Sequence, residues 1–182
     1  MQKRNSDMGL SDNTRRSERS LLLHRVGGLL LKLSIFAVSL LLVFGYLFGL
    51  LRYANQNMRP SFQDGDLILF FRLADRYYAD EVVVVEYGGE RLLERVIAVE
   101  GDEVNVTADG LSVNGSLVTE PRVLGETTLF EGGESLPVTV PQGKIFVLGD
   151  NREQSVDSRI FGCVDTNDVY GRVIGVFRRR NL

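Results

Sequence analysis

An uncharged apolar segment near the N-terminus constrains this chain more than any other feature. It runs from Leu33 to Leu51, 19 residues between Lys32 and Arg52 without a charged side chain. At a rise of about 1.5 Å per residue, a helix of this length nearly spans the hydrocarbon core of a bilayer. A cleavable signal peptide has a shorter apolar region followed by a small-residue cleavage site, which this segment does not clearly supply. We therefore predict a retained transmembrane anchor over residues 29–51.

Charge is distributed unevenly about this segment. Up to Lys32 the chain has seven Lys/Arg and three Asp/Glu, whereas the remainder has 14 and 21. By the positive-inside rule we expect a single-pass protein of the cell membrane, with its N-terminus in the cytoplasm and its folded part outside. Residues 1–28 are predicted to be a disordered cytoplasmic tail, since the first 20 have almost no apolar side chains. The acidic folded part argues against a nucleic-acid partner, so the expected partner is the lipid bilayer.

Beyond Arg52 the sequence is typical of β structure. Short β-branched or alternating runs such as VVVVEY, EVNV and KIFVLG are separated by turn residues, and no convincing amphipathic helix interrupts them. Asp109-Gly110 and Asn114-Gly115 are dipeptides that readily take positive φ and close tight hairpins. Residues 52–182 are enough for one compact domain, which we predict to be mainly β.

The cysteine and histidine content limits which disulfides and metal sites the chain could form. Cys163 is the only cysteine and His24 the only histidine. An intrachain disulfide is therefore excluded, and with no His or Cys cluster we expect neither a metal nor a cofactor. Gly45 and Gly49 form a small-xxx-small pair that could pack two membrane helices together.

Three stretches carry recognisable motifs, in this order: NQNMRPSFQDGDLILF from Asn55, ERVIAVEGDEV from Glu94, and GDNREQSVDSRIFG from Gly149. Behind a membrane anchor, they resemble the signature blocks of the type I signal peptidases, serine-lysine proteases that remove signal peptides from exported proteins. The single span and short chain look like the Gram-positive forms. The resemblance implies a signal peptidase I-like β domain behind one N-terminal transmembrane helix, with an apolar edge on the outer leaflet of the membrane.

The matching positions imply a set of supporting or binding residues. They are Met58, Pro60, Arg95, Asp150, Asn151, Arg152, Ser155, Asp157 and Arg159. In the family, the serine matching Ser155 orients the catalytic lysine and the aspartate matching Asp157 supports the site. The chemistry of the third motif also predicts a polar network that ties a loop to the sheet, with Asp157 and Arg159 as a charge pair.

The resemblance places unsuitable residues at the catalytic positions. The family mechanism needs a hydroxyl nucleophile and a lysine amine that burial keeps neutral. Asn57 stands at the serine position, Glu94 at the lysine position, and Asn55 where many members carry a serine that helps to bind the oxyanion. A carboxamide is a poor nucleophile, so Glu94 would have no group beside it to activate. We hypothesise that Asn57, Glu94 and Ser155 form a hydrogen-bonded cluster instead, which requires the first two side chains to lie within about 6 Å.

Two functional hypotheses remain. Signal-peptidase-like proteins without the dyad resemble this chain and assist the assembly of sortase-linked pili. The resemblance therefore implies an inactive chaperone or assembly factor that binds exported precursors or pilins by strand addition, with the sortase machinery as a further partner. The alternative is an active type I signal peptidase that removes signal peptides from secreted proteins, with its catalytic pair misaligned here, although no alternative Ser-Met or Ser-x-x-Lys lies between Tyr53 and Leu73. A relocated nucleophile at Ser61 is opposed by Pro60 and the strand entry, which fix its direction. A self-cleaving repressor is disfavoured by the anchor and the missing DNA-binding domain.

Overall fold

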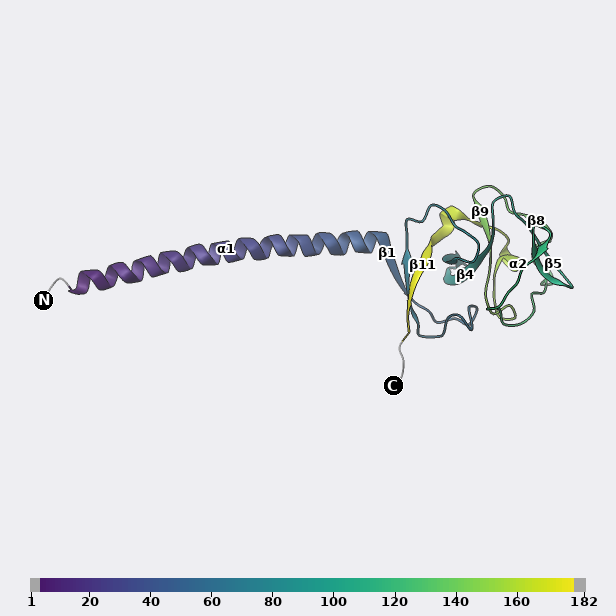
Figure 1. The fold of residues 1–182 in the computed structure, drawn as a ribbon, viewed down its shortest axis with the longest axis horizontal. Coiled ribbons are helices and arrows are strands. Elements are labelled where there is room, and N and C mark those ends of the chain that lie inside the picture. The colour runs from purple at the N-terminus through teal and green to yellow at the C-terminus, as the bar shows by residue number, and fades with distance from the viewer. Residues whose placement is uncertain (1–3, 179–182) are drawn as a thin grey trace. The chain divides into compact units, whose positions relative to one another are not determined.

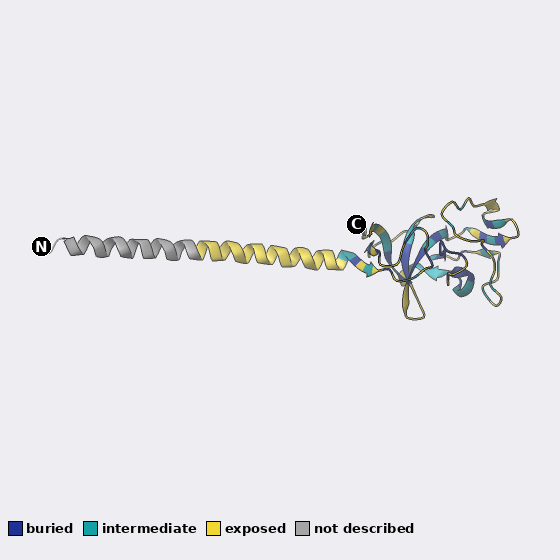
Figure 2. Ribbon diagram, turned by 90° about the horizontal axis from the view of Figure 1, so that it is seen from below, coloured by how far each residue is buried: buried dark blue, intermediate teal, exposed yellow. Residues whose placement is uncertain are grey.

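The computed structural model describes residues 4–178, with side chains from His24 onward. The chain divides into two units, residues 1–45 and 46–182. From Arg4 onward the first unit is part of helix α1 (Arg4–Leu47). From His24 to Leu47 this helix is long and apolar enough to cross a membrane, and nearly all of that stretch is exposed (Figure 2). A helix of this length and composition could span the hydrocarbon core of a bilayer.

Both ends of the predicted anchor differ in the structure. The helix begins at Arg4, so from there on residues predicted to be a disordered tail are helical. Residues 4–28 contain no proline, and a helix that has already nucleated gains one hydrogen bond with each residue that joins it. At the other end, α1 stops at Leu47 and strand β1 (Phe48–Arg52) begins. Residues 48–51 of the predicted anchor therefore belong to the β domain.

Because the helix ends at Leu47, the prediction that Gly45 and Gly49 could pack two membrane helices together is wrong. Gly49 lies in β1, where the ring of Phe70 occupies the place of a side chain at this position. Gly45 and Gly49 therefore share no helix face. The close approach of Phe70 explains why this strand position is a glycine.

The second unit is a mainly β domain, as predicted, built from two antiparallel sheets (Figure 1). The larger has the order β1-β2-β11-β3-β4-β9-β10, with β2 (Leu67–Phe71), β11 (Val169–Phe177), β3 (Val82–Tyr87), β4 (Glu90–Val99), β9 (Lys144–Leu148) and β10 (Val164–Asp165). The smaller has the order β7-β6-β5-β8, with β7 (Ser116–Leu117), β6 (Gly110–Val113), β5 (Glu103–Thr107) and β8 (Val138–Thr139). Helix α2 (Ser158–Phe161) and a 3₁₀ turn (Thr166–Asp168) complete it.

Short turns close the hairpins of the smaller sheet. Asn114-Gly115 joins β6 to β7 as predicted, whereas Ala108 and Asp109 join β5 to β6 and Gly110 is the first residue of β6. Gly110, Asn114 and Gly115 have positive φ, a conformation that glycine and asparagine adopt readily.

Strand β4 positions the site because it runs through all three apolar clusters of the domain. Leu92 and Val96 pack in the first cluster, Leu93 with Met58 in the second, and Ala98 in the third. A side chain of β4 that points between these clusters is therefore cut off from water.

Exposed apolar side chains gather on three strands that are neighbours in the larger sheet, β1, β2 and β11. They are Leu50, Leu67, Ile174, Val176 and Phe177. Such an apolar edge is what the resemblance implies, and its contact with lipid stays a prediction.

Candidate functional site

The structure brings Asn57 and Glu94 into direct contact. Asn57 begins the turn at residues 57–61, and Glu94 lies in the middle of β4. The Asn57 Nδ2 atom donates to Glu94 Oε1 across 2.6 Å and to the Leu93 carbonyl across 2.5 Å. The exposed fractions of Asn57 and Glu94 are 2% and 0%. The hypothesised pairing of these two side chains is thus confirmed, while their roles stay predictions.

Tyr53 fixes the orientation of the Asn57 carboxamide. The Tyr53 hydroxyl donates to Asn57 Oδ1 across 2.9 Å and accepts the Met58 N–H across 2.8 Å. Burial raises the pKa of Tyr53 to about 12, so its hydroxyl keeps its proton and remains a donor. With the oxygen of the carboxamide turned to Tyr53, its nitrogen must face Glu94. The sequence motifs did not single out Tyr53, and the only available signal was an aromatic residue in an otherwise polar segment.

The Glu94 carboxyl is buried and only partly satisfied. Its Oε2 atom has no hydrogen-bond partner among the described residues. Burial raises the pKa of Glu94 well above its ordinary value, the nearby charges of Asp157 and Asp150 raise it further, and the Asn57 hydrogen bond opposes them. The carboxyl group therefore favours its neutral, protonated form.

Ser155 does not join the pair as hypothesised. Its Oγ atom is buried and makes no hydrogen bond within the described part of the chain. It lies against Gly149, in the place where a side chain at that position would point. The expected donation from Ser155 to Glu94 is therefore wrong, since the serine packs against the backbone at the end of β9 instead.

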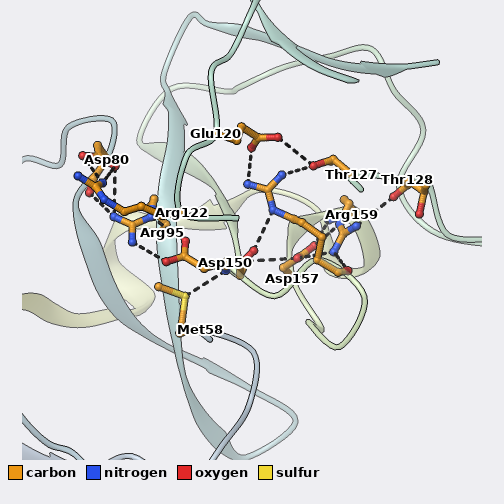
Figure 3. A network of polar contacts seen from close by, with 12 residues as sticks. Met58, Asp80, Arg95, Glu120, Arg122, Thr127, Thr128, Asp150, Asp157 and Arg159 are labelled. Carbon is orange, nitrogen blue, oxygen red and sulfur yellow. Dashed lines mark hydrogen bonds and ion pairs between the residues drawn. The ribbon is translucent and has the colours of Figure 1, made fainter. Parts of the chain in front are cut away.

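Arg95, the residue after Glu94, forms a second pair with Asp150, which Figure 3 shows. Arg95 donates through Nε and Nη2 to the two oxygens of Asp150, across 2.8 and 2.6 Å. The Ser61 hydroxyl donates to the same carboxylate, and Met58 Sδ accepts the Asp150 N–H across 3.4 Å. Ser61 therefore lies beside a carboxylate that Arg95 already neutralises, a poor setting for a relocated nucleophile.

The predicted charge pair of Asp157 and Arg159 is present, and both side chains are fully buried. Arg159 donates to the two Asp157 oxygens across 2.9 and 2.8 Å. It also donates to the carbonyls of Arg152 and Thr128 across 2.7 and 3.1 Å (Figure 3). Arg152 in turn donates to the Gly149 carbonyl across 2.9 Å. The third motif thus forms the expected network between loop and sheet.

The network extends to residues that the motifs did not mark. Arg152 pairs with Glu120 across 2.5 Å and donates to Thr127. Arg122 pairs with Asp80 across 2.6 Å. These contacts fasten the segment at residues 118–129, which lies between short strands and has no regular structure of its own.

The remaining motif residues shape the turn that carries Asn57. The half-buried Asn55 accepts the Gln56 and Asn57 N–H groups at Oδ1, across 2.6 and 3.3 Å. Asn151 donates its backbone N–H to the Asn57 carbonyl across 2.8 Å, and its side chain to the Gln56 carbonyl across 3.1 Å. Pro60 lies exposed in the turn. Asn55 and Asn151 therefore hold the backbone on either side of the pair.

The chemistry of the site follows from its atoms. Neither member of the pair carries the alcohol hydroxyl, thiol or amine on which serine, cysteine and lysine nucleophiles depend. Among the described residues no group of three or more His, Cys, Asp or Glu is arranged to hold a metal ion.

A groove lies beside the pair. Its cavity of 610 Å³ is lined by residues 51–55 on one side, and by Glu86 and residues 89–91 on the other. Strand β9 pairs with β4 only from Arg95 onward. Among the described strands, β3 alone pairs with β4 before that point. Of this stretch of β4, Glu90 and Arg91 line the groove, where an extended polypeptide could add as a strand.

Comparison with known proteins gives consistent matches. A family model described as "Signal peptidase, peptidase S26" matches residues 27–177. A signal peptidase I of Bacillus licheniformis is 33% identical over 160 residues, covering 80% of this chain and 86% of the relative. Signal peptidase IB of Staphylococcus aureus is 31% identical over 138 residues, covering 65% and 72%. A solved signal peptidase I from Enterococcus faecalis matches with a TM-score of 0.46 and 30% identity, covering 55% of this chain and 98% of that one.

Proposed function

This chain belongs to the signal peptidase family, and we propose that it is a member that binds extended segments of exported proteins without cleaving them. The observation that carries the proposal is the buried hydrogen bond between Asn57 and Glu94. The residues at these positions would have to supply the nucleophile and its base, and here they bind each other. The groove edge of β4 supports the binding half of the proposal.

The partners follow from the family. Signal peptidases act on exported precursor proteins in the membrane, so we propose precursors as the proteins that occupy the groove. Pilins, handled with the sortase machinery, are the finer proposal, taken from the resemblance to dyad-lacking members. The cytoplasmic N-terminus and extracytoplasmic β domain are proposed from the basic residues before the helix.

Cleavage and binding of an exported precursor by the full-length protein in detergent test the proposal together. The native chain is expected to bind the precursor and leave it intact. A double variant, Asn57→Ser with Glu94→Lys, is expected to gain cleavage, because it supplies a hydroxyl and an amine at the two paired positions. The matched control, Asn57→Ala with Glu94→Lys, lacks only the hydroxyl and should not cleave. Cleavage by the native chain would overturn the proposal.

The pilin proposal has its own test. Deletion of the protein from its host is expected to reduce pilus polymer while signal peptides are still removed. Accumulation of unprocessed precursors would instead identify the chain as a working peptidase.

An active signal peptidase is the second candidate function. What favours it is that the relatives at 31 to 33% identity are named as signal peptidases. It requires a nucleophile other than Asn57, and native cleavage that survives Asn57→Ala would support it.

A further inference from the structure

The groove edge of β4 offers two residues to an added strand. In a β-strand, successive residues direct their N–H and C=O groups to opposite sides. Arg95 pairs with Leu148 of β9, so Leu93 and Arg91 direct their backbone groups to the same side, where no described strand continues. Leu92 and Glu94 direct theirs to β3. Leu93 and Arg91 are thus the two positions at which an added strand could pair with this stretch of β4.

One of these two positions is already taken by the chain itself. The Asn57 carboxamide donates to the Leu93 carbonyl across 2.5 Å, as the backbone N–H of an added strand would. The same nitrogen donates to Glu94, and the carboxamide oxygen accepts from Tyr53. The amide is therefore held at both ends and cannot turn away from Leu93 without breaking these bonds.

The cavity ends where this contact begins. Along the first segment its lining reaches Asn55, two residues before Asn57, and along β4 it reaches Arg91, two residues before Leu93. Tyr53 lines the cavity, and its hydroxyl contacts Asn57. Tyr53 and the Asn57 carboxamide thus lie between the open groove and the Leu93 carbonyl.

We propose that Tyr53 and Asn57 form a plug that closes the inner end of the groove, so that a bound segment pairs with Arg91 and stops before Leu93. The inference rests on the proposed function, since it assumes that the groove binds polypeptide. Four exposed charged side chains line the open part: Arg52, Glu86, Glu90 and Arg91. Two are positive and two negative, which favours an extended segment with polar side chains of both signs over the small apolar residues that precede a signal-peptide cleavage site.

The plug can be tested without any bound segment. In the full-length protein in micelles, the side-chain amide resonance of Asn57, assigned by its loss in Asn57→Ala, is expected to exchange slowly with solvent. Tyr53→Phe removes only the hydroxyl and should speed that exchange by about tenfold. Tyr77→Phe is the matched control, because Tyr77 is also buried and its hydroxyl donates to the Ala74 carbonyl in another cluster. Fast exchange in the native protein, or no effect of Tyr53→Phe, would overturn the plug.

Peptide binding tests the consequence. The probe is a short synthetic peptide of alternating Thr with Lys or Glu, compared with versions extended by two residues at either end. The native protein is expected to bind all versions equally, because the added residues meet the plug. In Asn57→Ala, and to a lesser degree in Tyr53→Phe, one extended version should bind about fivefold tighter, the effect of one net hydrogen bond to the freed carbonyl.

The outcomes separate the two proposals. A native protein that already prefers one extended peptide has an open groove, which contradicts the plug. Variants that bind the short peptide but gain nothing from its extension also contradict it. If no peptide binds to any version, the holding function fails, while the exchange rate of the Asn57 amide still decides whether the plug exists.

Discussion

Asn57 and Glu94 share a 2.6 Å hydrogen bond although they lie 37 positions apart in the chain. The bond joins the turn after β1 to the middle of β4, at a point where both side chains are shielded from solvent. Both hydrogens of the carboxamide are used, one on Glu94 and one on Leu93. A segment that reaches this point must therefore break existing bonds before it can form its own, which links the proposed loss of catalysis to the proposed plug.

The first prediction concerns the pH dependence of stability. Burial raises the pKa of Glu94 in the folded protein, so the folded state holds its proton more tightly than the unfolded state. The free energy of unfolding contributed by Glu94 is fully present below its ordinary pKa of 4.5 and is lost as pH rises through the folded value. Glu94→Gln removes this dependence while keeping the acceptor for Asn57. Relative to this variant, the free energy of unfolding of the native protein should fall by at most about 1.4 kcal/mol for each unit by which the pH is raised.

The difference is measured by denaturing both proteins in detergent at a series of pH values above the ordinary pKa of Glu94, with circular dichroism as the readout. Hydrogen bonds from Arg178 and Arg122 lower the pKa values of the Asp66 and Asp80 carboxyls. These two carboxyls therefore change the free energy of unfolding with pH in the opposite direction. They do so equally in both proteins and cancel in the comparison. Glu131→Gln changes an exposed glutamate and serves as the control, which should follow the native curve. Parallel curves for Glu94→Gln and the native protein would contradict the buried neutral carboxyl.

The second prediction compares two buried serines. Ser155 Oγ has no hydrogen-bond partner among the residues that the structure describes, so Ser155→Ala should leave the free energy of unfolding unchanged or raise it by up to about 1 kcal/mol. Ser158 Oγ accepts the Val147 N–H across 3.0 Å. Ser158→Ala leaves that donor buried and unpaired and should cost about 1–3 kcal/mol. Chemical denaturation of both variants measures the contrast, and a larger loss for Ser155→Ala would show that its hydroxyl has a partner after all.

Local pattern and motif were sufficient for several features of this protein. The uncharged run predicted an apolar helix long enough to cross a membrane, alternation predicted the β domain, and the third motif predicted the Asp157–Arg159 pair. The contact between Asn57 and Glu94 followed from the resemblance, because two positions that cooperate in catalysis must lie together in the fold.

Other features depend on tertiary contacts that sequence patterns do not encode. Phe48 to Leu51 are as compatible with a lipid-facing helix as with a strand, and pairing with β2 decides in favour of the strand. Tyr53 reaches Asn57, four positions later, across a segment that has no regular secondary structure. Ser155 lost its expected role to the backbone geometry around Gly149, which no motif reports.

The third prediction concerns the close packing around Gly149. A Cβ atom at Gly149 would collide with Ser155 Oγ and the Asn57 carbonyl oxygen. Gly149→Ala should therefore lower the free energy of unfolding by about 1–3 kcal/mol, the usual cost of overpacking. Gly175→Ala is the control, because its nearest neighbour would be Leu69 Cβ at 3.9 Å, and it should change stability by no more than about 0.5 kcal/mol. Equal effects of the two variants, measured by thermal denaturation, would show that the chain is not tightly packed at Gly149.

The fourth prediction contrasts a buried with an exposed ion pair. Arg159→Met leaves Asp157 fully buried without its counter-charge and should lower the free energy of unfolding by about 3–5 kcal/mol. Arg122→Met breaks the pair with Asp80, in which the side chains are 54% and 63% exposed, and should cost no more than about 1 kcal/mol.

A double variant separates the buried charge from the lost packing. Asp157→Asn with Arg159→Met removes both charges and should be more stable than Arg159→Met alone, because no unpaired carboxylate remains in the interior. Urea denaturation of the full-length protein in detergent gives all of these differences on one scale. If Arg159→Met costs no more than Arg122→Met, the loop of the third motif does not depend on its ion pair, and the hydrogen bonds from Arg152 must hold it instead.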